Sequence, residues 1–263
     1  MRSVSALVAL VVLVALATLA PPAARAQEPD AAELLRRSID YHGGRAALEA
    51  WPNLELDGSY EMSGRMAGRS VDMMMKVRDD GAYRQEITFE FRGRKLTMTE
   101  IFDHAIRKRR FRVGWDDLPL DEPAEEAAHT HPFLLEAADR GPELAGDGSE
   151  ADVEVWYVEV EDGRARARLG LAKDDARLVS MEFPGVEAEG LGTREEVTKK
   201  MVYRDYRALG EVRYPYDQEY MTDGTPDGRL RIEEASVLAA FDDGWLTIPD
   251  PTDRFIPSEE LVF

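Results

Sequence analysis

The 263-residue chain has no cysteine and only four histidines. The lack of cysteine excludes disulfides, thiolate metal ligands, a cysteine nucleophile and the lipid-carrying cysteine of a diacylated lipoprotein. The motifs of G-x-S-x-G hydrolases, H-E-x-x-H metalloproteases, P-loop nucleotide sites and glycine-rich dinucleotide sites are also missing. The fold must therefore rest on its hydrophobic core, and none of these catalytic motifs is present.

Long apolar runs are confined to the start of the chain. Residues 6–20 are almost entirely apolar, two prolines end the run, and Ala24-Arg25-Ala26 matches the small-x-small pattern of signal peptidase sites. Because the run is short for a bilayer span, a cleaved signal peptide over 1–26 is favoured over a retained anchor. We expect a periplasmic or otherwise exported protein that does not span a membrane after processing, with one domain over residues 27–263.

Basic residues are few relative to acidic ones. The chain has 33 Lys and Arg against 52 Asp and Glu, which gives a net charge of −19, and this becomes −21 when the two arginines of the signal peptide leave. Such an excess of carboxylates repels phosphate backbones and anionic lipid surfaces. We therefore expect neither nucleic acid nor a membrane surface as a partner.

The mature chain begins with a helical pattern. Leucine and isoleucine recur at helical spacing within residues 30–50. Gly43-Gly44 predicts a helix end, because glycine adopts the left-handed conformation found after a helix C-terminus without steric cost. A second short helix is predicted at residues 45–49, before Trp51-Pro52.

From Leu54 on, the apolar period changes to two, as in a strand with one buried face. Turn residues separate the alternating segments at the spacing of consecutive hairpins. The strands expected after the one that begins at Leu54 are 71–77, 87–91, 96–102, 105–113, 153–160, 165–171, 177–183, 194–206, 211–222 and 229–239. Residues 123–140 are predicted as a helical insertion, and residues 141–151 as a loop.

The predicted fold class is mainly β (α+β). About eleven strands form one large curved antiparallel sheet, an unclosed half-barrel covered by a helical lid. Strands that are apolar on one side only must have that side covered, and the helical segments are the available cover. A hydrophobic cleft between sheet and helices is therefore expected.

Histidine and aspartate offer the few candidate sites for metal binding or catalysis. His129 and His131 could supply half of a metal site, but side chains at i and i+2 point in different directions on a helix, so a polar helix edge is favoured. We predict no metal, no cofactor and no enzyme activity; an enzyme would need His42, His129 or His131 in a cleft beside carboxylates. Aspartate pairs are typical of turns, and three fall in predicted turns, at residues 116–117, 174–175 and 242–243.

The basic run Arg107-Lys108-Arg109-Arg110-Phe111-Arg112 stands out against the acidic background. It could dock a head group or a partner. Pairing across strands with Glu90, Glu100 and Asp103 is the favoured interpretation.

Methionine is the most suggestive residue type, because several methionines fall on apolar faces of predicted strands. Methionine suits a pocket that adapts to variable apolar ligands, and it also fills gaps in a plain core, so both interpretations stay open. A shift of one residue in register would place the other face inside. The candidate cavity residues are Met73, Met75, Ile87, Phe89, Met98, Phe102, Leu134, Leu135 and Leu169.

Two groups of residues resemble a known family. The first is Tyr41, Gly43, Gly44, Leu48, Leu54 and Gly58, and the second is Tyr203 to Tyr206, Gly210, Val212, Tyr214, Pro215, Gly224 and Phe255-Ile256-Pro257. Together they resemble the LolA/LolB-like superfamily of periplasmic lipoprotein carriers, the outer membrane lipoprotein-sorting group. The carriers' cavity-closing arginine and receptor-contacting loop have no matching position in this chain.

The resemblance implies an unclosed antiparallel barrel with a helical lid around an apolar cavity. Carriers of that superfamily use the cavity to hold lipoprotein acyl chains between the two membranes. We therefore expect a non-enzymatic carrier or binder of a lipid, a lipoprotein acyl chain or another hydrophobic ligand, with an envelope protein as a possible partner. The alternative is a ligand-free accessory or sensor domain of the envelope that binds a protein partner.

Overall fold

The structure is a computed structural model, and from Ala31 on the chain forms one compact unit. The predicted signal peptide lies outside the described residues, as does most of the predicted helical insertion. The described residues are 28–63, 68–91, 94–103, 107–111, 115–117, 132–161, 166–189 and 193–247.

The N-terminal helices form as the sequence predicts. Helix α2 (Ala31–Tyr41) buries Leu34, Leu35 and Ile39 on one side. The chain leaves the helix through two glycines with positive φ, and the amide of Gly44 donates to the carbonyl of Ile39 at 2.9 Å, as in a Schellman motif. Helix α3 (Arg45–Glu49) follows directly, so the predicted break and second helix are confirmed.

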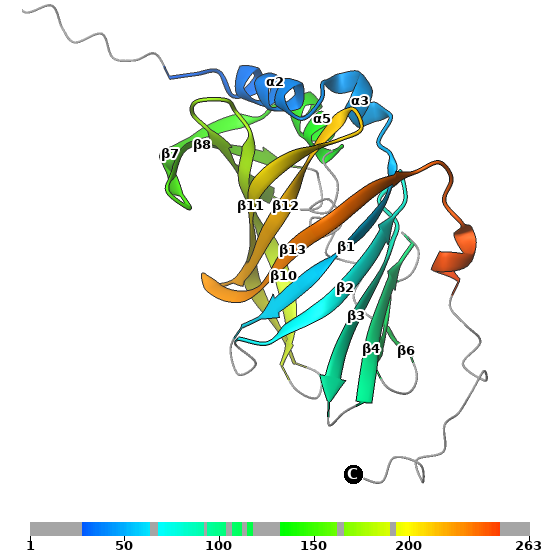
Figure 1. Ribbon diagram of the computed structural model, residues 1–263. Helices are drawn as coiled ribbons and strands as arrows, with labels where there is room; N and C mark the ends of the chain where they lie inside the picture. Colours follow the sequence, from blue (N-terminus) through cyan, green and yellow to red (C-terminus); the bar gives the residue numbers. More distant parts are fainter. Residues whose placement is uncertain are drawn as a thin grey trace, which may run out of the picture. The chain divides into compact units, whose positions relative to one another are not determined.

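Thirteen strands in the described part of the chain form one antiparallel sheet (Figure 1). Their spatial order is β6-β5-β4-β3-β2-β1-β13-β12-β11-β10-β9-β8-β7, so β6 and β7 are edges and the sheet is not closed. The predicted class, an unclosed half-barrel with few helices, is confirmed. The strand bounds are β1 Asn53–Met62, β2 Ser70–Val77, β3 Tyr83–Phe91, β4 Arg94–Phe102, β5 Arg107–Phe111, β6 Trp115–Asp117, β7 Glu143–Glu150, β8 Val153–Glu161, β9 Arg166–Ala172, β10 Leu178–Glu189, β11 Thr193–Leu209, β12 Val212–Thr222 and β13 Thr225–Leu238.

Two predicted segments differ from the structure. The loop predicted over residues 141–151 is wrong, because β7 occupies most of it as an edge strand paired with β8. Its sequence, ELAGDGSE, has no apolar alternation, and its strand conformation depends on the backbone ladder with its neighbour. Of the predicted helix over 123–140, the described residues include α5 (Phe133–Asp139), which begins directly after Pro132.

One face of the sheet, here called the inner face, carries the core. The rows of side chains that oppose one another across its strands are apolar, for example Met98, Ile87 and Met73 on β4, β3 and β2. Leu34 of α2 and Leu134 of α5 belong to the same buried cluster, so the helices pack against the inner face. In Figure 1 they lie together at one end of the sheet.

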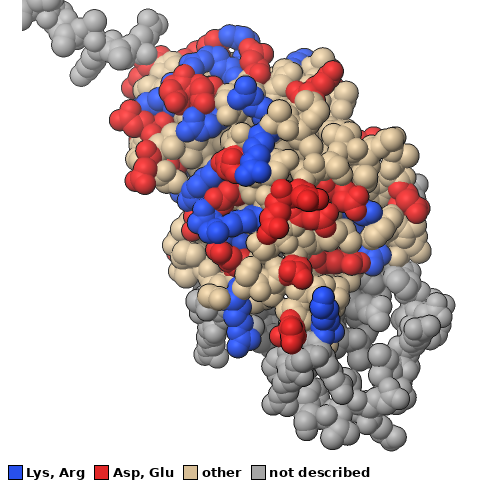
Figure 2. Space-filling model, in the orientation of Figure 1, with Lys and Arg blue, Asp and Glu red and all other residues tan. Residues whose placement is uncertain are grey.

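The opposite, outer face is charged. Arg229 donates to Asp217 at 2.6 Å, and Arg204 donates to Glu219 at 2.7 Å across neighbouring strands. Burial raises the pKa of Asp217, but the hydrogen bond and charge of Arg229 outweigh it and hold that pKa below its usual value. Figure 2 shows acidic and basic side chains spread over β1, β13 and their neighbours.

A short C-terminal segment is anchored on the outer face. After β13 the chain forms the 3-10 helix η2 (Asp243–Leu246), whose Leu246 packs with Ala82 and Ile101 in a small separate cluster. The ammonium of Lys76 lies 3.7 Å from the centre of the Trp245 ring. This segment therefore covers the one part of the outer face where Ile101 is buried.

The two sequence groups that resemble the carrier superfamily meet in space. The ring of Tyr41 lies edge-on to the ring of Tyr206, with centroids 5.8 Å apart. The amide of Arg213 donates to the carbonyl of His42 at 3.2 Å. A Cβ atom on Gly43 would stand 2.4 Å from the carbonyl oxygen of Glu211, so glycine is required there for space as well as for backbone conformation.

Replacing Gly43 by alanine should therefore destabilise the fold more than the same change at Gly44. Both residues have positive φ, a conformation that costs a non-glycine residue about 1 to 3 kcal/mol. At Gly44 a Cβ atom would meet nothing within 4 Å, whereas at Gly43 it would collide with the β11–β12 turn. We expect Gly43→Ala to lower the free energy of unfolding by at least about 1 kcal/mol more than Gly44→Ala in urea titrations. Equal losses of unfolding free energy in the two variants would contradict the close approach of Gly43 to the carbonyl of Glu211.

Candidate functional site

The candidate site is the inner face at the end of the sheet away from the helices. The inner-face side chains of β1 and β3 are fully buried near the helices, at Leu54 and Tyr83. Toward the other ends of these strands they are half-buried, at Tyr60 and Phe89. Met98 on β4 is half-buried as well. Apolar surface therefore remains accessible where the helices do not cover the sheet.

The inner face is continuous across the other half of the sheet. One row of opposing residues crosses eight strands from β1 to β7, and its members are apolar except for a glycine over which the Tyr60 side chain lies. The row consists of Met62, Gly228, Tyr220, Met201, Met181, Leu169, Val158 and Leu144. At about 4.8 Å between strands it extends for about 34 Å along the curved sheet.

The structure brings the nine candidate cavity residues into a single hydrophobic cluster on this face. It divides them into two groups by exposure. Phe89, Met98 and Leu135 are half-buried and keep surface that a ligand could contact. The fully buried members belong to the filled core: Met73, Met75, Ile87, Phe102, Leu134 and Leu169.

One carboxylate lies within this apolar face. Glu100 is 4% exposed and accepts a hydrogen bond from the Tyr83 hydroxyl at 2.9 Å. In the backbone register it stands opposite Arg109, which belongs to the basic run. The predicted pairing of that run with Glu100 therefore agrees with the register. Of the other two predicted partners, Glu90 opposes Lys95 in the register and Asp103 pairs with Arg78 at 3.0 Å; the side chains of the basic run lie outside the described residues.

His42 is the one histidine among the described residues, and it is fully buried. Its ring stands edge-on to the rings of Tyr41 and Tyr206, each 5.1 Å away, and Nδ1 lies 2.7 Å from the carbonyl oxygen of Ser38. Burial lowers the pKa of His42 to about 4, so the ring is neutral near pH 7. His42 therefore lies buried between tyrosine rings and not in an open cleft.

The remaining metal and catalytic candidates have mixed outcomes. His104, His129 and His131 lie outside the described residues. Asp174 and Asp175 lie in a turn as predicted and pair with Arg177, whereas residues 116–117 lie in β6 and the turn prediction there is wrong.

Within the described ranges no group of three or more His, Asp or Glu side chains could hold a metal ion. No helix there has the length and apolar character to cross a membrane.

Sequence reasoning missed the half of the inner face formed by β1 and β10–β13. Tyr60 and Tyr220, with ring centroids 6.1 Å apart, were not among the candidates, nor were Met62, Met181 and Met201. The three methionines carried a signal, since each lies on a predicted strand or at its end. Their common row depends on strand order, which the periodicity of a single strand does not contain.

Comparison with known proteins agrees with this geometry. No family model and no curated protein matches the sequence. A domain from Vibrio parahaemolyticus described as an outer membrane lipoprotein-sorting protein superposes with a TM-score of 0.52 at 10% identity, covering 82% of this chain and 96% of that chain. A LolA superfamily protein from Nitrosomonas europaea superposes with a TM-score of 0.51 at 11% identity, covering 84% and 98%. The chain therefore has a LolA-like fold, as the resemblance predicted.

The burial of His42 predicts a pH-dependent stability. In the unfolded chain His42 binds a proton near pH 6.5, whereas in the folded chain its pKa is about 4. The free energy of unfolding therefore falls as the pH drops through this window. Relative to a His42→Phe variant, the natural protein should lose about 2 kcal/mol of unfolding free energy between pH 7 and pH 5. Urea titrations of both proteins at several pH values measure this difference. The two proteins have the same carboxyl groups, so the contribution of these groups to the pH dependence cancels. Parallel curves for the two proteins would contradict the buried neutral histidine.

Proposed function

We propose that this chain, which has a LolA-like fold, is a periplasmic, non-enzymatic carrier or binder of a lipid, a lipoprotein acyl chain or another hydrophobic ligand. The observation that carries the proposal is the continuous apolar inner face, which is left half-buried at the end away from the helices. The ligand lies there, against Phe89 and Met98 on one side and Tyr60, Met62 and Tyr220 on the other.

The chemistry of this face suits a ligand without a fixed shape. Each methylene group removed from water contributes about 0.8 kcal/mol, so ten methylenes contribute about 8 kcal/mol before the entropy cost of binding. Methionine and tyrosine side chains adapt to variable apolar partners. Affinity can therefore come from the chain of a ligand, with little recognition of its polar end.

The names of the compared structures support the same class of ligand. One is described as a lipoprotein-sorting domain and the other as a LolA superfamily protein. The predicted signal peptide supports export to the compartment where such carriers act. These observations support a role in the cell envelope and leave the ligand to be identified by experiment.

Native mass spectrometry of the protein, purified from an exporting host in mild buffer, identifies any ligand that it retains. Denaturing extraction of the same sample should release a lipid or fatty acid. A ligand-free mass together with no uptake of a fluorescent fatty acid would overturn the proposal. It would favour the alternative, an accessory domain that binds a protein partner.

A pair of neighbouring substitutions on β4 tests which face binds. Met98 is half-buried on the inner face, and Thr97 is exposed on the outer face. Because a carboxylate is poorly tolerated against an apolar ligand, Met98→Glu should weaken uptake of a fluorescent fatty acid at least tenfold. Thr97→Glu adds the same charge on the other face and should change uptake less than twofold. Equal effects of the two variants, both folded by circular dichroism, would place the binding elsewhere.

A further inference from the structure

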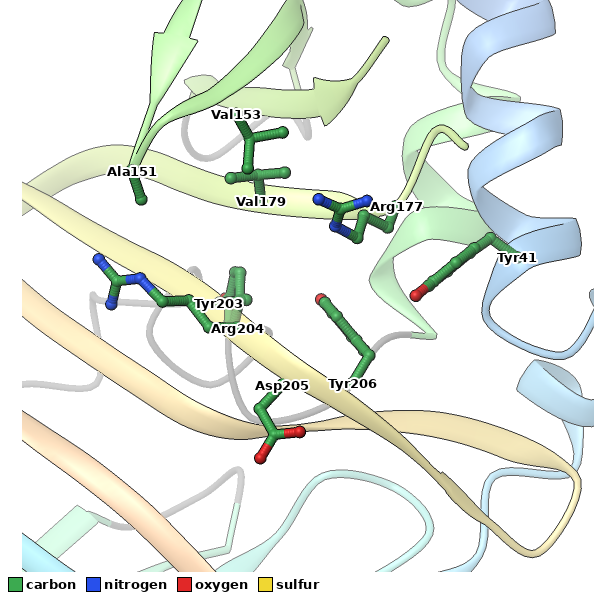
Figure 3. A pocket seen from close by; sticks show the side chains of 9 residues that line it. All are labelled: Tyr41, Ala151, Val153, Arg177, Val179, Tyr203, Arg204, Asp205 and Tyr206. Atoms are coloured by element: carbon green, nitrogen blue, oxygen red, sulfur yellow. The ribbon is translucent and has the colours of Figure 1, made fainter. Parts of the chain in front are cut away.

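A second hollow, separate from the inner face, lies where the end of α2 meets β10 and β11. Its volume is about 280 Å³. Figure 3 shows Tyr41 and Arg177 at one end and Arg204 at the other, with Val153 and Val179 along one wall. The two valines belong to a small apolar cluster distinct from the main core.

Several hydrogen-bond donors around this hollow are not used by the fold. Arg177 pairs through one guanidinium nitrogen, Nη1, with Asp175 at 2.8 Å and Asp174 at 3.5 Å. Arg204 pairs through Nη2 with Glu219, and its Nη1 is buried without a hydrogen-bond partner in the described structure, so this atom is closed to a ligand. The Tyr41 ring contacts His42 and Tyr206, and its hydroxyl forms no hydrogen bond with the described residues. Arg177 therefore retains donors for an additional acceptor.

Two other polar groups of the lining, the Asp205 carboxylate and the Tyr206 hydroxyl, are already engaged. The carboxylate of Asp205 is held by Arg207, with Nε 3.1 Å from Oδ2. The Tyr206 hydroxyl donates to the carbonyl of Leu178 at 2.9 Å, and burial raises its pKa well above the usual value, so it stays neutral. The lining thus offers donors and apolar walls, and little free negative charge.

Positive φ is frequent in the backbone around the hollow. Five non-glycine residues of the described chain have positive φ, and four of them line this hollow or adjoin a residue that does. Ala151 (φ 47°) and Asp205 (φ 51°) line it, while Asp152 (φ 66°) and Ala176 (φ 61°) are sequence neighbours of lining residues. Ala151 and Asp152 form the two-residue turn between β7 and β8, where positive φ is the usual hairpin conformation. At Asp205 and Ala176 such a conformation costs about 1 to 3 kcal/mol.

We propose that this hollow is a binding site for a small organic carboxylate with a compact apolar or aromatic body. A guanidinium group matches a planar carboxylate with two parallel hydrogen bonds, and the Tyr41 hydroxyl can donate a third. Val153, Val179 and the tyrosine rings receive the body of the ligand. A singly charged anion fits better than phosphate, because the chain carries a net charge of −19 that repels multiply charged anions.

Benzoate is a suitable probe, with benzyl alcohol as its neutral analogue and inorganic phosphate as a competing anion. NMR titration of the purified protein at low ionic strength should give saturable benzoate binding with a Kd of about 1 mM or tighter. Benzyl alcohol and phosphate should each bind at least tenfold more weakly. Absence of saturable benzoate binding overturns the proposal, and tighter binding of phosphate overturns the assignment to a carboxylate.

Variants locate the site. Arg177→Gln should weaken benzoate binding at least tenfold, and Tyr41→Phe, which removes one hydroxyl and keeps the ring, about threefold or more. Arg231→Gln removes an exposed outer-face arginine paired with Glu61 and should change nothing. If both the Arg177→Gln and the Tyr41→Phe variants bound benzoate as tightly as the unchanged protein does, the proposal would be overturned.

The Met98→Glu variant separates this site from the inner face. Because benzoate is partly apolar, it could enter the inner face instead of the hollow. The proposal requires that Met98→Glu leave benzoate affinity unchanged while fatty acid uptake falls. Loss of benzoate binding in that variant would assign the probe to the inner face and overturn the separate site, whatever the fate of the proposed carrier function.

Discussion

The contact between the turn after α2 and the turn between β11 and β12 is the constraint on which the rest of the structure depends. There the backbone of Gly43 approaches the carbonyl of Glu211 so closely that no side chain fits between them. The carbonyl of His42 and the amide of Arg213 close the contact with a hydrogen bond. This contact fixes the N-terminal helices at one end of a sheet in whose middle β1 pairs with β13, from opposite ends of the chain. The other end of the inner face is consequently left half-buried.

A second constraint is the difference between the two faces of the sheet. Alternation along strands such as β2, β3 and β9 places apolar side chains inside and polar or charged ones outside, and the register aligns these faces from one strand to the next. The outer charges are largely neutralised in pairs such as Arg204 with Glu219. Ion pairs that reach solvent contribute little to stability compared with the burial of the apolar inner face, so the fold rests on that face. The surface proposed to bind a ligand is thus an extension of the surface that holds the protein together.

The sequence predicted the features that depend on local pattern. The helix end at Gly43-Gly44 follows from two adjacent residues, and the inward side of β9 follows from the alternation of Ala167, Leu169 and Leu171 with arginine and glycine. Strand β7 was missed because its conformation depends on its pairing with β8. Strand β10 runs past the predicted end at Phe183 through Pro184, which opposes Thr198 on β11. In both cases the strand conformation depends on backbone pairing with a neighbouring strand, which the local sequence does not reveal.

The candidate sites divide in the same way. Inner-face residues such as Phe89 were predictable, because burial on one side of a strand is visible in its alternation; that Phe89 remains half-buried while Phe102 is covered depends on where the helices pack. The hollow beside Tyr41 was not predictable, because it joins the end of a helix, two hairpins and the strained residues that flank them.

The two proposed sites also differ in the interaction that binds the ligand. Salt screens the guanidinium attraction at the hollow but leaves apolar burial intact, so ionic strength acts on one site and largely spares the other. Ligands of the two sites are therefore separable by their response to salt, before any side chain is changed.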